Sequence, residues 1–139
     1  MNLQVVPLRP EHSAIAPHLR QADIEEIYAS GWTSPTLAVA YSIARSEHGA
    51  AVLLDRKPCA VFGVDGNIIW LVATEEVANH PVTFYRLSRR IFHKLSKGCN
   101  CLENFVYYKN TLSLRWLQWL GFHIEHKQGL FHHVWWKGV

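Results

Sequence analysis

The spacing of apolar residues separates this chain into a helical first third and a strand-rich middle. Residues 3–8 fit an edge strand, since Pro7 has no N–H to donate to a ladder. Apolar side chains then recur at helical spacing, with Pro, Ser or Gly near the segment ends. The pattern predicts helices over residues 11–19, 21–29 and 36–48.

The middle of the chain consists of short apolar runs separated by turn residues. Strands are predicted over residues 50–54, 59–64 and 67–74. The four residues from Asp55 to Pro58 would connect the first two strands, and Asp65-Gly66 would form the next turn. These three strands are expected to form an antiparallel meander.

A helix is predicted after the meander, capped by Asn79 or His80, with Pro81 in its first turn and an end near Lys97. The last third continues with a strand over residues 105–108, since four β-branched or aromatic side chains follow one another there.

The second helix of the last third is expected from Thr111 to Leu120. Asn110 would be its N-cap, accepting a hydrogen bond from the N–H of Ser113, and Gly121 would follow its end. A broad apolar stripe of this helix is expected to pack; it consists of Leu112, Trp116, Trp119 and Leu120.

A final hairpin is predicted from strands at residues 124–126 and 131–135 around Gln128-Gly129. The complete order is β-α-α-α-β-β-β-α-β-α-β-β. It predicts an α+β fold in which helices flank a mixed, mostly antiparallel sheet.

Composition supports one ordered domain over residues 1–139. Hydrophobic residues make up 49% of the 139 residues and charged residues 18%. The net charge of +3 is too small to indicate nucleic acid as a partner. The three cysteines and the absence of a signal-peptide pattern favour reduced thiols in a cytoplasm, and no apolar run is long enough to cross a membrane.

No metal site is expected. Cys99 and Cys101 have no second ligand pair at zinc-finger spacing. In the final hairpin, strand alternation directs the neighbouring His132 and His133 to opposite faces.

One motif resembles a known family. Asn110, Ser113, Leu117 and Gly121-Phe122 match, in spacing, the last strand-helix unit of the GNAT acetyltransferase superfamily. That superfamily has a Tyr at the position of Leu117, so the hydroxyl that usually protonates the coenzyme A thiolate is missing here.

Three longer strings, at residues 19–31, 62–66 and 110–122, are similar to a narrower group, the small acetyltransferase-like proteins of tailed phages and prophages. That group includes the internal virion protein A of short-tailed coliphages. The resemblance implies a location in the cytoplasm of an infected bacterium or in the virion, and a phage structural protein or host protein as partner.

The superfamily resemblance implies acetyl-CoA as cofactor and an amine, on a small molecule or a protein, as acceptor. The backbone of residues 72–74 would pair with the pantetheine amides, and Asn110 would orient the thioester. The cofactor-binding candidates are Val72, Ala73, Thr74, His80, Arg86, Asn110 and Ser113.

The catalytic candidates are Glu26, Asn110 and Tyr107. Arg20, Asp23 and Glu26 are three residues apart, which favours an ion-pair ladder along the helix over amine recognition or proton removal by Glu26. By the resemblance, Tyr107 lies on the strand beside the thioester; it could replace the hydroxyl lost at position 117, although packing is the more common role.

The expected pyrophosphate loop departs from the superfamily. Residues 74–81 contain no Gly, and Glu75 and Glu76 would repel a pyrophosphate unless they point away. The next helix carries a basic stripe that is either a solvated face or a contact for phosphates or an acidic partner; it consists of Arg86, Arg90, His93, Lys94 and Lys97.

Two functions therefore remain open. One is acetyl transfer from acetyl-CoA to an amine. The other is a non-catalytic, virion-associated or host-directed binding module that uses exposed tryptophans such as Trp32, Trp135 or Trp136 as anchors.

Overall fold

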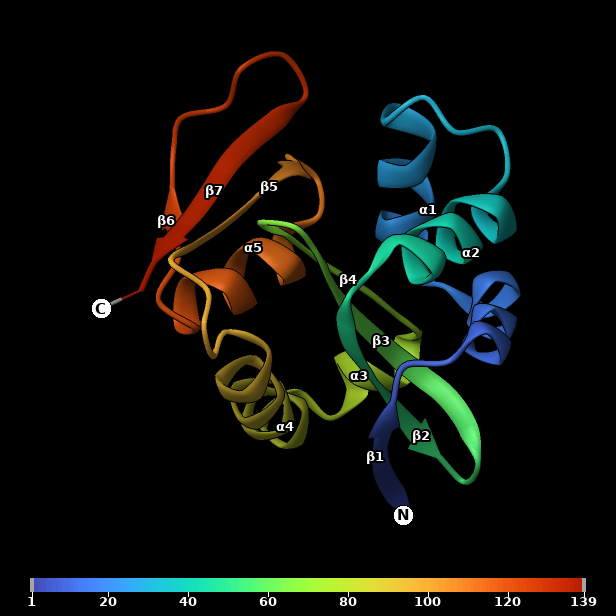
Figure 1. The fold of residues 1–139 in the computed structure, drawn as a ribbon. Coiled ribbons are helices and arrows are strands. Elements are labelled where there is room, and N and C mark those ends of the chain that lie inside the picture. The colour runs from blue at the N-terminus through green and yellow to red at the C-terminus, as the bar shows by residue number, and fades with distance from the viewer. Residues whose placement is uncertain (1, 139) are drawn as a thin grey trace.

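A computed structural model describes residues 2–138, whose strands form a single seven-stranded sheet in the order β1-β2-β3-β4-β5-β7-β6 (Figure 1). The strands are β1 (Leu3–Pro7), β2 (His48–Leu54), β3 (Lys57–Asp65), β4 (Ile68–Ala73), β5 (Cys101–Tyr107), β6 (His123–Ile124) and β7 (Phe131–Lys137). All neighbours pair antiparallel except β4 and β5, which are parallel. The predicted meander and final hairpin are confirmed.

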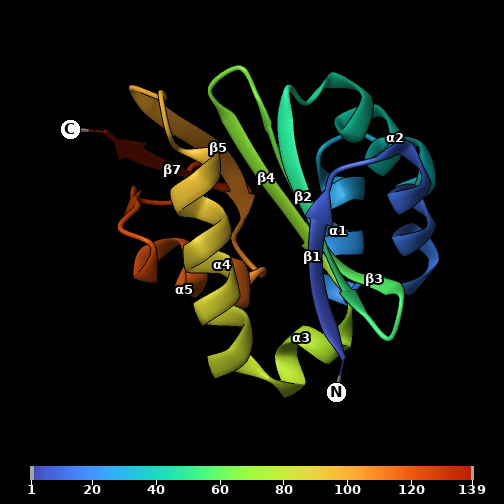
Figure 2. The same ribbon diagram turned by 60° about the horizontal axis from the view of Figure 1, so that its bottom comes forward.

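Helices cover both faces of the sheet (Figures 1 and 2). They are the 3-10 helix η1 (Pro10–His18), α1 (Gln21–Ala29), α2 (Pro35–Arg45), α3 (Glu75–Asn79), α4 (Pro81–Leu95) and α5 (Thr111–Trp119). One apolar cluster joins η1 and α2 to the sheet, and a larger one joins α3, α4 and α5 to the other face. The predicted α+β fold class is confirmed. None of these helices combines the length and hydrophobicity that crossing a bilayer requires.

Two helix predictions need correction. The segment expected over residues 11–19 is a 3-10 helix, Pro10–His18, with Pro17 near its end, where the missing N–H interrupts any regular hydrogen-bond ladder. The helix expected to reach residue 48 ends at Arg45. Glu47 instead donates its N–H to Val64 O, so the chain has already joined the sheet.

The connection between β2 and β3 is shorter than predicted. Leu54 pairs with Lys57, which leaves a two-residue turn instead of a four-residue loop. Asp55 and Arg56 both have positive φ, at 50° and 71°, as a type I′ turn requires. This turn matches the strand twist, so it is favoured over a longer loop despite the side chains at both positions.

The contact between β4 and β5 defines the centre of the sheet. The two strands pair at a single position, Ile68 with Glu103, near the start of each strand. The side chain of Asn104 then bridges to Ile69 O at 2.7 Å. Beyond this point the strands diverge, and we call the space between them the slot.

Helix α5 packs with only part of its expected stripe. Trp116 is fully buried, but Trp119 is 47% exposed. Trp119 lies at the margin of the buried face, where it meets Tyr85 of α4 edge-on at a centroid distance of 5.0 Å. The prediction that Trp119 packs into the core is therefore wrong.

Candidate functional site

A buried ion pair lies at the start of α1. Arg20, the residue before the helix, donates to both carboxylate oxygens of Asp23, at 2.9 and 3.2 Å. Their side chains are 5% and 1% exposed. The predicted ion pair between Arg20 and Asp23 is confirmed, but it does not continue to Glu26 as a ladder along the helix, and the Asp23 carboxylate faces the sheet.

The ion pair extends to α5 on the far side of the slot. Arg20 also donates to Asn110 Oδ1 and Ser113 Oγ, both at 3.2 Å, and Asn110 Nδ2 donates to Asp23 Oδ1 at 3.1 Å. We call these four residues the Arg20 network. Asn110 was expected to cap α5, and that prediction is wrong: its side chain makes no capping bond. Hydrogen bonds to buried charges are stronger than a neutral capping bond, which explains why the Asn110 side chain bonds to Arg20 and Asp23 instead of capping α5.

The Arg20 network is also joined to the end of β4. Ala73 N–H donates to Asp23 Oδ2 at 3.0 Å, and Ala73 O accepts from Arg20 N–H at 2.9 Å. Val72 faces Val61 of β3 in the ladder, and Thr74 N–H donates to Cys59 O. The network therefore closes the wide end of the slot, and the backbone of Ala73 and the N–H of Thr74 already have partners within the protein.

Glu26 lies one helical turn beyond Asp23 and faces β5. Its Oε1 accepts from Tyr107 N–H at 2.8 Å and from Asn110 Nδ2 at 3.3 Å. Burial raises the pKa of Glu26 to about 7, and the nearby Asp23 carboxylate adds to this effect. The two hydrogen bonds and Arg20 act in the opposite direction but are weaker.

Two hollows meet at Glu26. A narrow cavity of about 50 Å³ lies in the slot, between β4 and β5 and beneath α4 and α5. A second hollow, of about 120 Å³, lies against α1 and α2 on the opposite face. Glu26 and Leu71 line both, so the carboxylate is positioned between the two faces of the sheet.

Three buried polar atoms near the slot have no hydrogen-bond partner. They are Thr74 Oγ1 at the end of β4, Ser88 Oγ on α4 and Trp116 Nε1 on α5. Ser88 and Trp116 line the cavity itself. Because an unpaired buried polar group costs about 1–3 kcal/mol, such a grouping indicates a place where a ligand or water supplies the partners.

The edge of β4 that faces β5 is also partly open. Alternation along β4 directs the backbone N–H and C=O of Ile69, Leu71 and Ala73 toward this edge. Ile69 O is bonded to Asn104, and Ala73 is bonded to the Arg20 network. The backbone of Leu71 lies between them and borders the cavity.

These groups fit a slender, partly polar arm such as pantetheine in their chemistry. The cavity is too small for such an arm in this structure. Ligand pockets generally enclose about 300 Å³ or more, whereas this cavity has a volume of about 50 Å³. Holding the arm therefore requires the cavity to widen.

The expected pyrophosphate loop does not fit a pyrophosphate. Glu75 and Glu76 occupy the first turn of the five-residue helix α3, which was not predicted and is held down by the buried Val77. Pro81 removes an N–H from the start of α4. The His80 side chain makes no capping bond at the start of α4, although its backbone N–H donates to Val77 O at the end of α3.

The predicted site residues are thus only partly assembled. Glu26, Asn110, Ser113 and the backbone N–H of Tyr107 converge at the slot. The Tyr107 ring instead meets Tyr108 and Phe131 edge-on. His80 and Arg86 are exposed and take no part in the Arg20 network.

Sequence reasoning missed three residues of the slot: Leu71, Ser88 and Trp116. Ser88 left a signal, since it is a polar residue on the buried face of α4 with Phe84, Ile91 and Leu95. Within residues 2–138, no three His, Cys, Asp or Glu side chains are grouped closely enough to hold a metal ion.

Solved structures provide the comparison for this arrangement, whereas no protein-family model and no curated protein matches the sequence. The PaiA N-acetyltransferase of Thermoplasma acidophilum, in complex with coenzyme A, aligns with a TM-score of 0.66 at 15% identity over 99% of this chain and 100% of its own. The GNAT domain of S. lividans PAT aligns with a TM-score of 0.72 at 8% identity over 97% and 90%.

Aminoglycoside acetyltransferase AAC(6')-Ib, also in complex with coenzyme A, aligns with a TM-score of 0.65 at 12% identity over 98% and 95%. At these identities the likeness concerns the fold. The chain has the fold of the GNAT acetyltransferases, with a diverging β4–β5 pair at its centre.

Proposed function

We propose that the chain transfers the acetyl group of acetyl-CoA to an amine. The observation that carries this proposal is the position of Glu26, where hollows on opposite faces of the sheet meet, together with its pKa of about 7. A donor held between α4 and α5 and an amine held against α1 and α2 would meet at this carboxylate. A general base is most effective when its pKa lies near the working pH.

Glu26 would accept the proton that the amine loses. Both hydrogen bonds to its carboxylate go to Oε1, so Oε2 is the oxygen left for the proton. Tyr107 N–H and Asn110 would keep the carboxylate in place. This assigns the catalytic role to Glu26 and a positioning role to Asn110 and the backbone of Tyr107.

When bound, acetyl-CoA supplies an activated acyl group as a thioester. The groups that would hold its arm are the Leu71 backbone and the unpaired atoms of Thr74, Ser88 and Trp116. Pairing with the backbone of Ala73 requires Asp23 to release it.

A calorimetric titration with acetyl-CoA tests cofactor binding. We expect the wild type to bind and Ser88→Ala to bind up to about tenfold more weakly, as for the loss of one hydrogen bond. Ser96→Ala is the matched control, since Ser96 bonds to His93 O at the end of the same helix, away from the slot. Absence of heat at millimolar acetyl-CoA would contradict the proposal.

The base is tested by measuring thiol release from acetyl-CoA with a panel of amines. Glu26→Gln should retain cofactor binding and lose roughly 10²–10⁴-fold in rate, the usual contribution of a general base. Glu25→Gln, the neighbouring carboxylate on α1, should keep its rate. Equal rates for the two variants would remove Glu26 from the mechanism.

A second function is favoured by the closed slot and the acidic loop. On this reading the chain is a non-catalytic GNAT-fold protein of a tailed phage that binds a virion or host protein. Glu75 and Glu76 in place of a phosphate loop support it, and the phage context rests on the sequence resemblance. Trp32 is an available anchor, since it is 36% exposed and tilts against Tyr41.

The second function predicts that the chain sediments with phage particles, or co-purifies with one host protein, while the acetyl-CoA titration gives no heat. Trp32→Ala should then weaken that association without changing the fold. The location expected for both functions is the infected bacterium, and for the second also the virion.

A further inference from the structure

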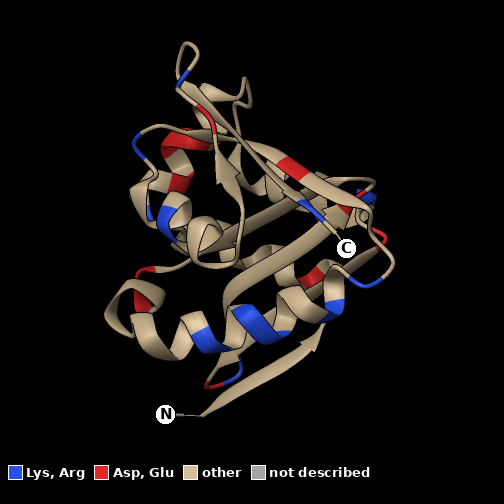
Figure 3. Ribbon diagram, turned by 90° about the vertical axis from the view of Figure 1, so that its left-hand side faces the viewer, with Lys and Arg blue, Asp and Glu red and all other residues tan. Residues whose placement is uncertain are grey.

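A basic groove runs along α4, on the outer surface of the molecule. Arg and Lys positions, coloured blue, gather on this helix (Figure 3), and its sequence from Pro81 to Leu95 contains no acid. The basic residues of this segment, together with Lys97 just after its end, are all exposed; they are Arg86, Arg89, Arg90, His93, Lys94 and Lys97. None of the ion pairs among residues 2–138 includes one of them.

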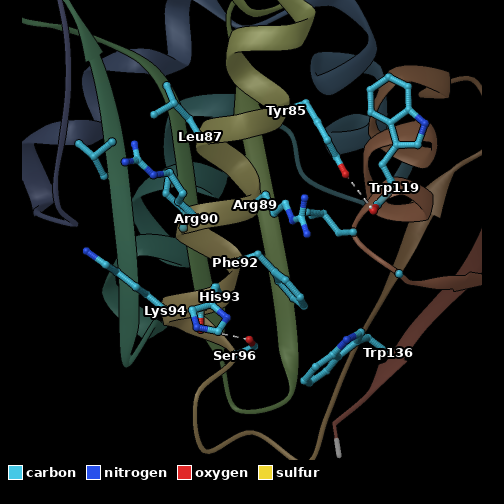
Figure 4. A pocket seen from close by; sticks show the side chains of 14 residues that line it. Tyr85, Leu87, Arg89, Arg90, Phe92, His93, Lys94, Ser96, Trp119 and Trp136 are labelled. Carbon is cyan, nitrogen blue, oxygen red and sulfur yellow. Dashed lines mark hydrogen bonds between the residues drawn. The ribbon is translucent and has the colours of Figure 1, made fainter.

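Aromatic side chains form the wall of the groove beside α4 (Figure 4). Tyr85 and Trp119 form one edge-on pair at 5.0 Å, and Phe92 and Trp136 form another at 5.3 Å. Arg89 projects toward the space between the two pairs. We call this surface the α4 groove; its open volume is about 980 Å³.

The aromatic pairs also contact neighbouring elements. Tyr85 OH reaches Trp119 O at 3.4 Å, and the Phe92 ring is also in contact with Phe122 at 5.6 Å. Trp119 nevertheless remains 47% exposed, so part of its ring is available to a ligand. An ordinary solvated helix face would have no such aromatic wall.

We propose that the α4 groove binds a single-stranded nucleic acid, with phosphates on the α4 cations and bases stacked on Trp119 and Trp136. The four Arg and Lys residues of α4, from Arg86 to Lys94, span roughly 12 Å of helix, and Lys97 follows just after its end, enough for several phosphates. Interleaved cations and exposed aromatic rings are the combination by which proteins hold single strands without reading their sequence. An acidic polypeptide would use the cations but leave the rings without a stacking partner.

This surface was not apparent from charge alone. The net charge is only +3, because the 14 Lys and Arg residues are nearly balanced by 11 acids over the whole chain. The aromatic residues of the groove come from α4, α5 and β7, which only the fold brings together. The groove shares Phe92 and Leu120 with the slot cavity but includes neither Glu26 nor the Arg20 network, so the proposal does not depend on acetyl transfer.

The test is fluorescence anisotropy of the full chain with a labelled oligothymidylate of about 16 nucleotides. For four phosphate contacts, raising the salt from about 50 to about 200 mM should weaken binding about 50-fold. Arg89→Glu/Arg90→Glu should abolish binding. Arg56→Glu/Arg115→Glu carries the same change in net charge outside the groove and should retain most of it.

Trp119→Ala tests stacking, since losing one stacked base should weaken binding roughly tenfold. Circular dichroism verifies that each variant is folded. The proposal is overturned if no binding occurs at low salt, if both charge-reversal variants lose affinity equally, or if polyglutamate displaces the oligonucleotide as effectively as unlabelled oligothymidylate does. The last result would identify the groove as a site for an acidic polypeptide.

Discussion

The guanidinium of Arg20 donates a hydrogen bond at 3.2 Å to Asn110 Oδ1, 90 residues further along the chain. This bond connects the start of α1 with the residue before α5, across the wide end of the slot. Strands β4 and β5 pair at only one position, so the two halves of the sheet depend on such side-chain links. The Arg20 network therefore joins the two halves of the sheet at the wide end of the slot.

Removing the arginine should destabilise the protein strongly. Arg20→Ala leaves the Asp23 carboxylate buried without its charge partner, and such losses cost about 3–5 kcal/mol. Denaturant unfolding measures the change. The control is Arg45→Ala, which breaks an exposed pair with Asp65 and should have little effect because water screens that pair. Similar losses in the two variants would show that the Arg20 network does not join the two halves of the sheet.

The raised pKa of Glu26 predicts a specific pH dependence of stability. The folded state favours the protonated carboxyl, so this stability is fully present below about pH 4.5, the ordinary pKa, and is lost as the pH rises through about 7. Glu26→Gln keeps a neutral side chain and should not show this loss. Thermal unfolding of both proteins between about pH 5 and 8 is the measurement, and parallel curves would indicate an unshifted Glu26.

If Glu26 is the catalytic base, the rate of acetyl transfer should rise with pH over the range in which the stability falls. Only the ionised carboxylate accepts a proton, so the rate of acetyl transfer should rise with pH and level off above about 7. The profile of kcat/KM against pH measures this for the free enzyme. A rate that is constant across this range would assign proton removal to water or to another group.

The close approach of β3 to the Trp70 ring of β4 predicts that adding one methyl group at Gly63 destabilises the protein. The Trp70 ring lies directly against Gly63 of the neighbouring strand, and its Nε1 donates to Ser46 Oγ at 2.7 Å. In Gly63→Ala the new Cβ would overlap the ring, with a loss of about 1–3 kcal/mol. Trp70→Leu in the same background should recover part of the loss, and simple additivity of the two substitutions would contradict the proposed overlap.

The turn between β2 and β3 offers a stabilising substitution. Arg56 has φ of 71°, a conformation that costs most residues about 1–2 kcal/mol and glycine almost nothing. Arg56→Gly should therefore stabilise the protein by about 0.5–1 kcal/mol, after the entropy of the unfolded glycine is subtracted. Thermal unfolding measures it; destabilisation would show that the arginine side chain has contacts that outweigh the strain.

Local patterns were sufficient for most elements, because a helix or strand needs only its own periodicity and end signals. The helix over residues 21–29 agrees with α1 at both ends, and Pro81 begins α4 as predicted. Errors occurred where another part of the chain competed. Glu47 joined β3 instead of extending α2, and residues 75–79 became helical because Val77 reached the core.

The candidate site was predicted in part. The sequence indicated Glu26 and Asn110 by their spacing and their resemblance to a known motif, and it placed Arg20 and Asp23 beside Glu26. It could not show that the Asp23 carboxylate is buried or that Asn110 turns away from its own helix. Both outcomes depend on a buried charge whose partners lie on α1, β4 and α5.

The sequence by itself therefore determined the order of the strands and most of the helices, the α+β class and the motif that marks the centre of the fold. Only the tertiary structure decided that the slot is closed, that Glu26 lies between two hollows with a raised pKa, and that aromatic rings border the basic face of α4. The physical reason is range: hydrogen bonds within a helix join residues about four apart, whereas burial and charge depend on residues that only folding brings into contact.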